Sequence, residues 1–191
     1  MTVSPDLPTP RSAMTVQGPF PYERLGITDA NNHLWIEPVP GAEPGGLVLN
    51  QFDTEKDALA EKACTYFMDL GLSPDQLVLC HMDKRPDAGL HTELARLGVL
   101  LEYDTFYRLK YNPSENLRSL IEEMASAGLS DRVALATDMA ESELYHFIGG
   151  GAGLASLPGE IRDQLIKKGI PGTARKQMLG GNIARRVAGI H

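Results

Sequence analysis

Apolar residues occur along this chain in two alternating patterns. Short uninterrupted runs are typical of strands buried on both faces of a parallel sheet, and apolar residues that recur every three or four positions are typical of a helix face. Apolar runs that each close on a polar residue occur at Gln76–His81 and Arg132–Asp138, and Val99–Asp104 is a further predicted strand that ends in an acid. The helical pattern covers Thr54–Leu70, Ala88–Leu97 and Pro113–Ala127. The alternation predicts an α/β fold with parallel strands, as an open doubly wound sheet or as part of a barrel.

Proline and glycine define the regions on both sides of this alternation. Residues 1–20 are rich in proline and poor in apolar residues, so we expect an extended or disordered N-terminal arm followed by one domain over residues 21–191. Leu25–Glu37 predicts a first strand that ends in a polar turn. The C-terminal region predicts a glycine loop at Gly149–Ser156, a helix at Pro158–Lys168, and a helical stretch at Thr173–Val187 that is interrupted at Gly180 and Gly181.

Composition and charge narrow the classes of function. The 191 residues are 42% hydrophobic and carry a formal net charge of -7, and no cluster of Lys or Arg stands out, so nucleic acid is not an expected partner. No apolar run approaches the roughly 20 residues that span a bilayer, which also argues against a membrane partner. The N-terminus lacks the basic start and apolar centre of a signal peptide. We therefore expect a cytoplasmic protein.

Three polar residues at the ends of predicted strands form a candidate metal site. His33 follows the first strand, His81 closes the run at 76–81, and Asp138 closes the run at 132–138. A single histidine in such a place is more often structural than a ligand. Parallel strands, however, bring their carboxyl ends to one rim, and imidazoles with a carboxylate are the ligands of catalytic zinc. The joint placement thus predicts a zinc site.

Other polar residues have weaker functional interpretations. We expect Cys64 and Cys80 to be buried reduced thiols, because their spacing matches neither a zinc knuckle nor a CxxC pair. His91 lies in a helical pattern and is expected to be solvated or to cap the helix. Tyr107 and Arg108 follow a predicted strand and are expected in a rim loop, where barrels place substrate contacts.

Long parts of the sequence resemble a known family. The segment Leu72–Ala140, the glycines at 149–153 and the closing QMLGGNIARR resemble the second half of phosphotriesterase-like proteins of the amidohydrolase superfamily. Thr15–Ile36 resembles the first strand of that family and the hairpin before it. The resemblance implies a TIM-type (β/α)8 barrel that holds two divalent metals, usually zinc, and hydrolyses phosphotriesters, lactones or carboxylic esters. It also implies a small-molecule substrate.

The resemblance assigns roles to the three candidate residues. His33 corresponds to the second histidine of a His-x-His pair on the first strand, His81 to the histidine of the sixth strand, and Asp138 to the aspartate of the eighth strand. Family members use all three as metal ligands. The aspartate also moves the proton of the attacking water, so Asp138 is the expected catalytic residue.

The chain departs from the family at several ligands. Asn31 stands where the first histidine of the pair is expected, and an amide oxygen is a poor substitute for imidazole on zinc. Asp53, Thr54 and Glu55 stand where the family has His-Thr-Glu after the fifth strand. The bridging lysine and the fifth-strand histidine therefore have no counterpart. We expect an incomplete barrel from which a central block is missing, with the join near residues 53–54.

Three functional interpretations follow. The first is a zinc-dependent hydrolase with an impaired site. The second is a catalytically inactive fragment or pseudoenzyme that acts by association only, since an incomplete barrel exposes strand edges that favour pairing with another chain or another copy. The third, a nucleotide-binding domain, ranks last because Asp29–Asn32 lacks the glycine turn that such a domain needs.

Overall fold

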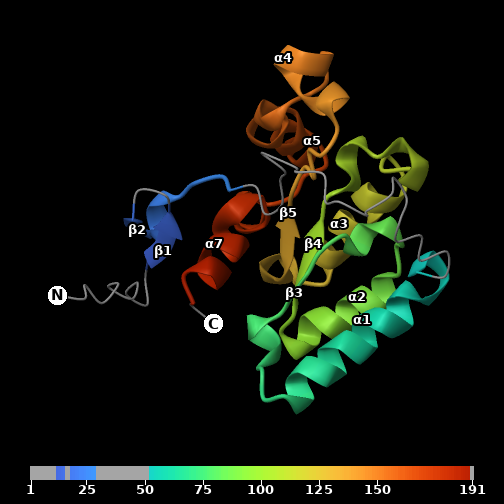
Figure 1. The fold of residues 1–191 in the computed structure, drawn as a ribbon. Coiled ribbons are helices and arrows are strands. Elements are labelled where there is room, and N and C mark those ends of the chain that lie inside the picture. The colour runs from blue at the N-terminus through green and yellow to red at the C-terminus, as the bar shows by residue number, and fades with distance from the viewer. Residues whose placement is uncertain (1–11, 16–17, 29–51, 190–191) are drawn as a thin grey trace, which may run out of the picture.

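The computed structural model describes residues 12–15, 18–28 and 52–189. Within these residues the chain forms a parallel sheet of three strands in the order β3-β4-β5, with Val78 opposite Leu100 and Leu101 opposite Val133. A separate antiparallel hairpin lies near the N-terminus (Figure 1). The strands are β1 (Ser12–Thr15), β2 (Gly18–Pro21), β3 (Val78–Leu79), β4 (Leu100–Tyr103) and β5 (Val133–Leu135).

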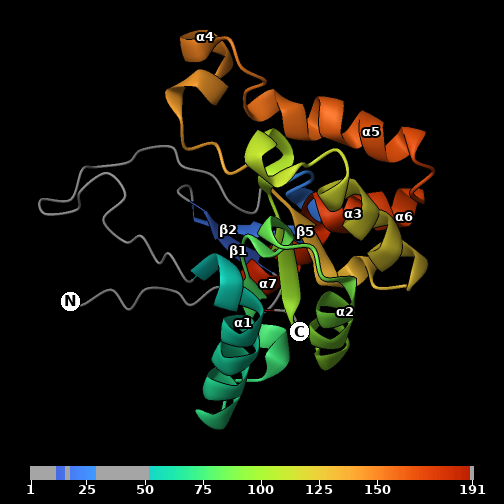
Figure 2. The ribbon, with the colours of Figure 1, turned by 90° about the vertical axis from the view of Figure 1, so that its right-hand side faces the viewer.

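Helices cover the sheet on two sides. Figures 1 and 2 show α2 and α3 on one side and α7 on the other. A π-helical segment precedes α5, and a second one joins α6 to α7 with a kink at Gly180. The helices are α1 (Phe52–Asp69), α2 (Ala88–Leu97), α3 (Asn116–Ser126), α4 (His146–Gly149), α5 (Arg162–Lys167), α6 (Gly172–Lys176) and α7 (Asn182–Val187).

Local sequence explains why α2 and β4 form where they do. Asp87 caps the start of α2 by accepting a hydrogen bond from the Leu90 backbone N–H at 3.0 Å. Gly98 ends the helix with a φ of 114°, which a residue with a side chain adopts only with strain. The chain then enters β4, whose four residues are all buried. Leucine and tyrosine fill three of these positions, as expected of a strand buried on both faces, and the fourth is Glu102.

The helices and strands predicted between residues 54 and 138 are confirmed in type and order. The predicted and observed bounds of α2 agree, and the three strands are shorter than predicted because their last residues turn out of the sheet. Residues 25–28 are not in a strand, and the rest of the predicted first strand lies outside the described residues. The hairpin of β1 and β2 lies largely within the segment expected to be an extended or disordered arm. The predicted join at 53–54 falls inside α1 and stays a prediction.

The core lies between the sheet and its flanking helices. Leu101, Leu117, Met124 and Leu135 are among its fully buried side chains. Strand β3 is only half buried, because among the described residues it pairs on one side alone. None of the helices in the described ranges combines the length and the apolar character of a membrane span.

Candidate metal centre

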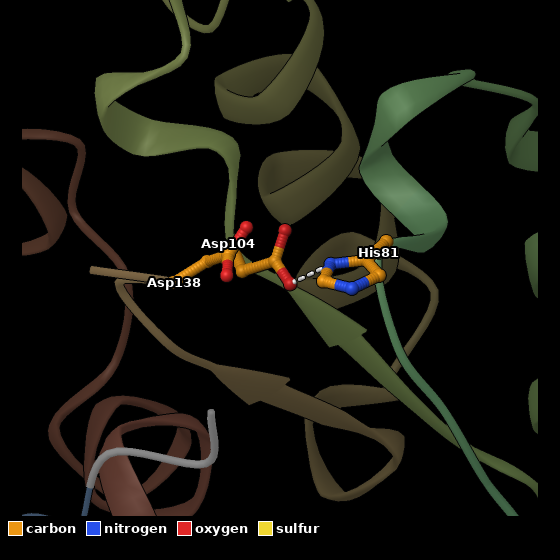
Figure 3. A group of neighbouring side chains, drawn as sticks. All are labelled: His81, Asp104 and Asp138. Atoms are coloured by element: carbon orange, nitrogen blue, oxygen red, sulfur yellow. Dashed lines mark hydrogen bonds and ion pairs between the residues drawn. The ribbon is translucent and has the colours of Figure 1, made fainter. Parts of the chain in front are cut away.

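Three polar side chains meet at the carboxyl ends of the parallel strands. His81 follows β3, Asp104 comes directly after β4, and Asp138 follows β5. One ligand atom from each lies within 4.8 Å of the other two. Figure 3 shows the His81 ring turned toward the carboxylate of Asp104, with Asp138 beside it. The parallel pairing brings them together, since strand ends with the same direction share one edge of the sheet.

Two of these residues have an unusual backbone conformation. His81 has a φ of 60° and Asp138 a φ of 45°. Positive φ is uncommon for residues with a side chain, and it occurs more often where function fixes a side chain direction. The strained backbone turns both residues away from the path of their strands.

His81 and Asp104 make the shortest contact in the cluster. The Nδ1–H of His81 donates to Oδ2 of Asp104 over 2.5 Å. This hydrogen bond raises the pKa of His81 above its ordinary value, although burial acts in the opposite direction. Asp104 is fully buried, whereas 35% of the His81 side chain is exposed. One side of the imidazole therefore remains accessible to a small molecule.

Asp83 fixes the turn that carries Asp104. Its buried carboxylate accepts hydrogen bonds from the backbone N–H of Asp104 at 3.1 Å. It also accepts from the backbone N–H and the hydroxyl of Thr105 at 2.8 and 2.6 Å. Burial raises the pKa of Asp83 to about 6, and the nearby charge of Asp104 acts in the same direction. Because Asp83 lies two residues after His81, these bonds tie the turn after β3 to the turn after β4.

Arg108 fixes the position of Asp138 through two hydrogen bonds. Its guanidinium donates to the backbone carbonyl of Asp138 at 2.8 Å and to Oδ2 at 3.1 Å. It also forms an ion pair with Glu141. Arg108 lies in the loop after β4, so these contacts connect it to the loop after β5. The interpretation of Arg108 as a rim-loop residue is consistent with this position.

The donor set fits a divalent metal. Two carboxylate oxygens, Oδ1 of Asp104 and Oε1 of Glu102, are buried and have no hydrogen-bond partner among the described residues. Burial raises the pKa of Glu102 to about 7. A buried carboxylate oxygen without a partner is unfavourable, and a cation bound beside it removes that cost. One imidazole with several carboxylates is a donor set that zinc and similar divalent metals accept.

The sequence-predicted site residues have different outcomes. The structure brings His81 and Asp138 to one edge of the sheet, as the strand pattern predicts, and their metal-binding role stays a prediction. His33 and Asn31 lie outside the described residues. Asp104 was not among the predicted ligands. The signal for it was present, because the run Val99–Asp104 ends in an acid as the run 132–138 does.

Two weaker predictions are wrong. His91 is fully buried and its Nδ1 lies 2.9 Å from the Tyr103 hydroxyl, so it is neither solvated nor a cap. The partner that buries it comes from β4, which helical periodicity does not reveal. Cys64 is buried as expected, but Cys80 is exposed in the turn after β3. Both cysteines are free thiols.

Comparison with known proteins identifies similar sequences and folds. The profile of the phosphotriesterase family matches residues 56–186, which is more than half of the chain. The phospho-furanose lactonase of Mycoplasmopsis synoviae (strain 53) is 27% identical over 86 residues, which are 44% of this chain and 24% of that protein.

Solved structures of similar fold include a lactonase from Listeria monocytogenes, with a TM-score of 0.63 and 24% identity. That comparison covers 69% of this chain and 41% of the lactonase. A phosphotriesterase homology protein from Escherichia coli, with phosphate in its active site, gives a TM-score of 0.63 at 20% identity, covering 68% of this chain and 44% of that protein. The chain thus spans less than half the length of these relatives.

Proposed function

The chain belongs to the phosphotriesterase family, and from this premise we propose that it is a metal-dependent hydrolase of ester-like bonds. The substrate is a small molecule with a phosphotriester, lactone or carboxylic ester group. The single observation that carries the proposal is the convergence of His81 and Asp138 at one edge of the sheet, within the span of a metal site. The metal is zinc, and His33 is its further ligand.

Each residue of the cluster has a role in this proposal. His81 and Asp138 hold the metal, and Asp138 accepts the proton of the attacking water. A bound zinc ion would polarise the ester group and lower the pKa of water. Arg108 orients the Asp138 carboxylate through the hydrogen bond at 3.1 Å.

Zinc-dependent turnover by the full chain tests the proposal. The protein is stripped with a chelator, reloaded with zinc and assayed on an aryl phosphotriester, a γ-lactone and an aryl acetate. We expect turnover that requires zinc and falls at least about 100-fold in His81→Ala and Asp138→Asn. His146→Ala is the matched control, because His146 is exposed on α4 outside the cluster. Equal activity without zinc would refute the proposal.

A second candidate is a catalytically inactive fragment or pseudoenzyme that acts by association. It is favoured by the strand order, since β3 and β5 each pair on one side only among the described residues. Such edges bind other strands readily. Less than about a tenth of an equivalent of bound zinc, with no turnover on any substrate, would favour this candidate. Light scattering would then measure whether copies of the chain associate.

We also propose that the sheet is part of an incomplete TIM-type barrel, with β3, β4 and β5 as strands six to eight. The parallel order and the fold shared with the longer relatives support this assignment. The missing central strands would have been lost at a join near residues 53–54. Sequencing the gene from its source tests the join. An uninterrupted reading frame across residues 53–54 supports a natural deletion, and an intervening coding segment refutes it.

A further inference from the structure

Asp104 lies where a metal ligand would lie, and one of its carboxylate oxygens lacks a hydrogen-bond donor among the described residues. It is fully buried at the end of β4, and its Oδ2 lies 2.5 Å from His81 Nδ1. Its second oxygen, Oδ1, is buried without a hydrogen-bond partner in the described part of the chain. Beside it lies the carboxyl group of Glu102, which can donate to Asp104 only while it carries a proton. A carboxylate held in this way is built to receive a cation or a donor that the protein alone does not supply.

The carboxyl groups around Asp104 also favour a bound cation. Glu102 lies on β4 and Asp104 directly follows the strand, and their carboxyl groups lie close enough to interact. Oε1 of Glu102 is buried as well, and the Glu102 carboxyl group interacts with Cys80 and Asp104. Across the cluster, Asp138 adds a third carboxylate, and it is paired with Arg108. Carboxylates gathered at one buried edge repel one another, and a bound cation would relieve that repulsion.

The family resemblance does not supply a ligand at this position. It assigns ligand roles to His33, His81 and Asp138 only, and it leaves the bridging lysine and one histidine without counterparts. His81 and Asp138 serve two different metals in that pattern. Here they converge with Asp104 instead, with ligand atoms no more than 4.8 Å apart. Metal to ligand bonds of about 2.0–2.2 Å span donors roughly 3–4 Å apart, so small adjustments allow all three to bind one ion.

We propose that Asp104 is a direct ligand of a single divalent cation, which it binds together with His81 and Asp138. The cation would replace the proton between His81 Nδ1 and Asp104 Oδ2. That proton is released to solvent, the imidazole stays neutral with its remaining proton on Nε2, and the donors separate slightly to admit the ion. A carboxylate from β4 thus takes over from ligands that this chain lacks. The inference rests on the proposed function only for the presence of a metal, and it is independent of any hydrolytic activity.

In a competing role, Asp104 only orients the His81 ring through its hydrogen bond to Nδ1, and the metal binds Nε2. In that arrangement the carboxylate never touches the ion, and its removal typically lowers affinity about 10- to 100-fold. A direct ligand differs from a positioning residue in one observable way. If a thiolate replaces the carboxylate, only a direct ligand gives a charge-transfer band between sulfur and cobalt.

Cobalt binding to the full chain tests the inference. All variants carry Cys80→Ser, because the native thiol lies next to His81 in the sequence. We expect this parent to bind one equivalent of Co²⁺ in a titration. The Asp104→Cys variant is expected to add a sulfur-to-cobalt band in the near ultraviolet that the parent lacks. Cobalt bound by that variant without the band would overturn the inference, as would a parent that binds no cobalt.

Affinity measurements provide a second test that does not need the cysteine variant to fold. Asp104→Asn is expected to weaken Co²⁺ binding by more than about 100-fold, beyond the range of a positioning residue. Asp163→Asn is the control, because Asp163 is exposed on α5 outside the cluster, and it is expected to change the affinity by less than about tenfold. A smaller loss for Asp104→Asn overturns the inference. If Asp104→Cys shows the sulfur-to-cobalt band but the native chain hydrolyses no ester, only the proposed function is refuted. If the native chain shows zinc-dependent hydrolysis but cobalt-bound Asp104→Cys lacks the band, only this inference is refuted.

Discussion

Asn182 offers a sharp test of how the last helix is fixed to the sheet. Its side chain is 4% exposed, and its Nδ2 donates to the backbone carbonyls of Ser130 and Val133, both at 2.8 Å. These carbonyls lie at the start of β5, so the two bonds hold α7 against the strand that leads to Asp138. Asn182→Ala removes the donor of both bonds and leaves a small cavity.

The expected loss of stability follows from these contacts. Each buried hydrogen bond contributes about 1 kcal/mol net, and leaving a buried carbonyl without its donor costs about 1–3 kcal/mol. We therefore expect Asn182→Ala to lower the free energy of unfolding by about 2–4 kcal/mol. Asn182→Asp keeps the size but places a carboxylate against two carbonyl oxygens, so its loss should be larger, and larger at pH 7 than at pH 4.

Urea denaturation followed by circular dichroism measures both variants in the presence of a chelator. With a slope of about 2 kcal/mol per molar urea, the loss for Asn182→Ala shifts the midpoint down by roughly 1–2 M. Asn116→Ala is the control. Asn116 donates a hydrogen bond of 2.9 Å to the Tyr111 carbonyl at a half-buried site, and we expect its loss to cost about 1 kcal/mol or less. If Asn182→Ala cost no more than Asn116→Ala, the reasoning would be refuted.

Three further predictions concern the described core and turns. Thr105→Val removes the hydroxyl that donates to Asp83 at 2.6 Å; unfolding by urea should show a loss of about 1.5–3 kcal/mol, greater above the Asp83 pKa of about 6 than below it. Glu102 has a folded pKa of about 7 against 4.5 because of burial, so in metal-free protein its contribution to stability is lost as pH rises from about 4.5 to 7. The free energy of unfolding of Glu102→Gln should therefore rise relative to that of the native chain between pH 4.5 and 7, by up to about 3 kcal/mol. A difference between the two proteins that does not change with pH would contradict this. Gly180→Ala should lower the melting temperature clearly, because its Cβ would lie 2.4 Å from the Thr28 backbone nitrogen at a φ of 153°. Gly159→Ala, with nothing within 4 Å, should change it little.

The sequence predicts the elements well where a local pattern decides them. The run Val99–Asp104 contains the buried strand β4, and Gly98 marks the end of α2 because a glycine tolerates the required φ of 114°. Periodicity did not reveal the burial of His91, since its partner Tyr103 comes from another element. A helical pattern shows which residues share a face, and it does not show what that face contacts.

The candidate site shows the same division between local and distant information. Parallel strands that each end in a polar residue were enough to predict that His81 and Asp138 share an edge of the sheet. The contacts that define the site lie beyond such a pattern. Asp104 bonds to a residue 23 positions away, and Arg108 reaches one 30 positions away.

What the sequence determined by itself was therefore the family, the alternation of strands and helices, and the edge where polar residues gather, because each depends on residue types along the chain. Only the tertiary structure decided that Asp104 faces His81, that Asp83 ties their two turns together, and that Arg108 holds Asp138. Those facts depend on the register of β3, β4 and β5 and on backbone turns with positive φ at His81 and Asp138. Register and turn geometry are set by packing across the whole sheet, so no local stretch of sequence contains them.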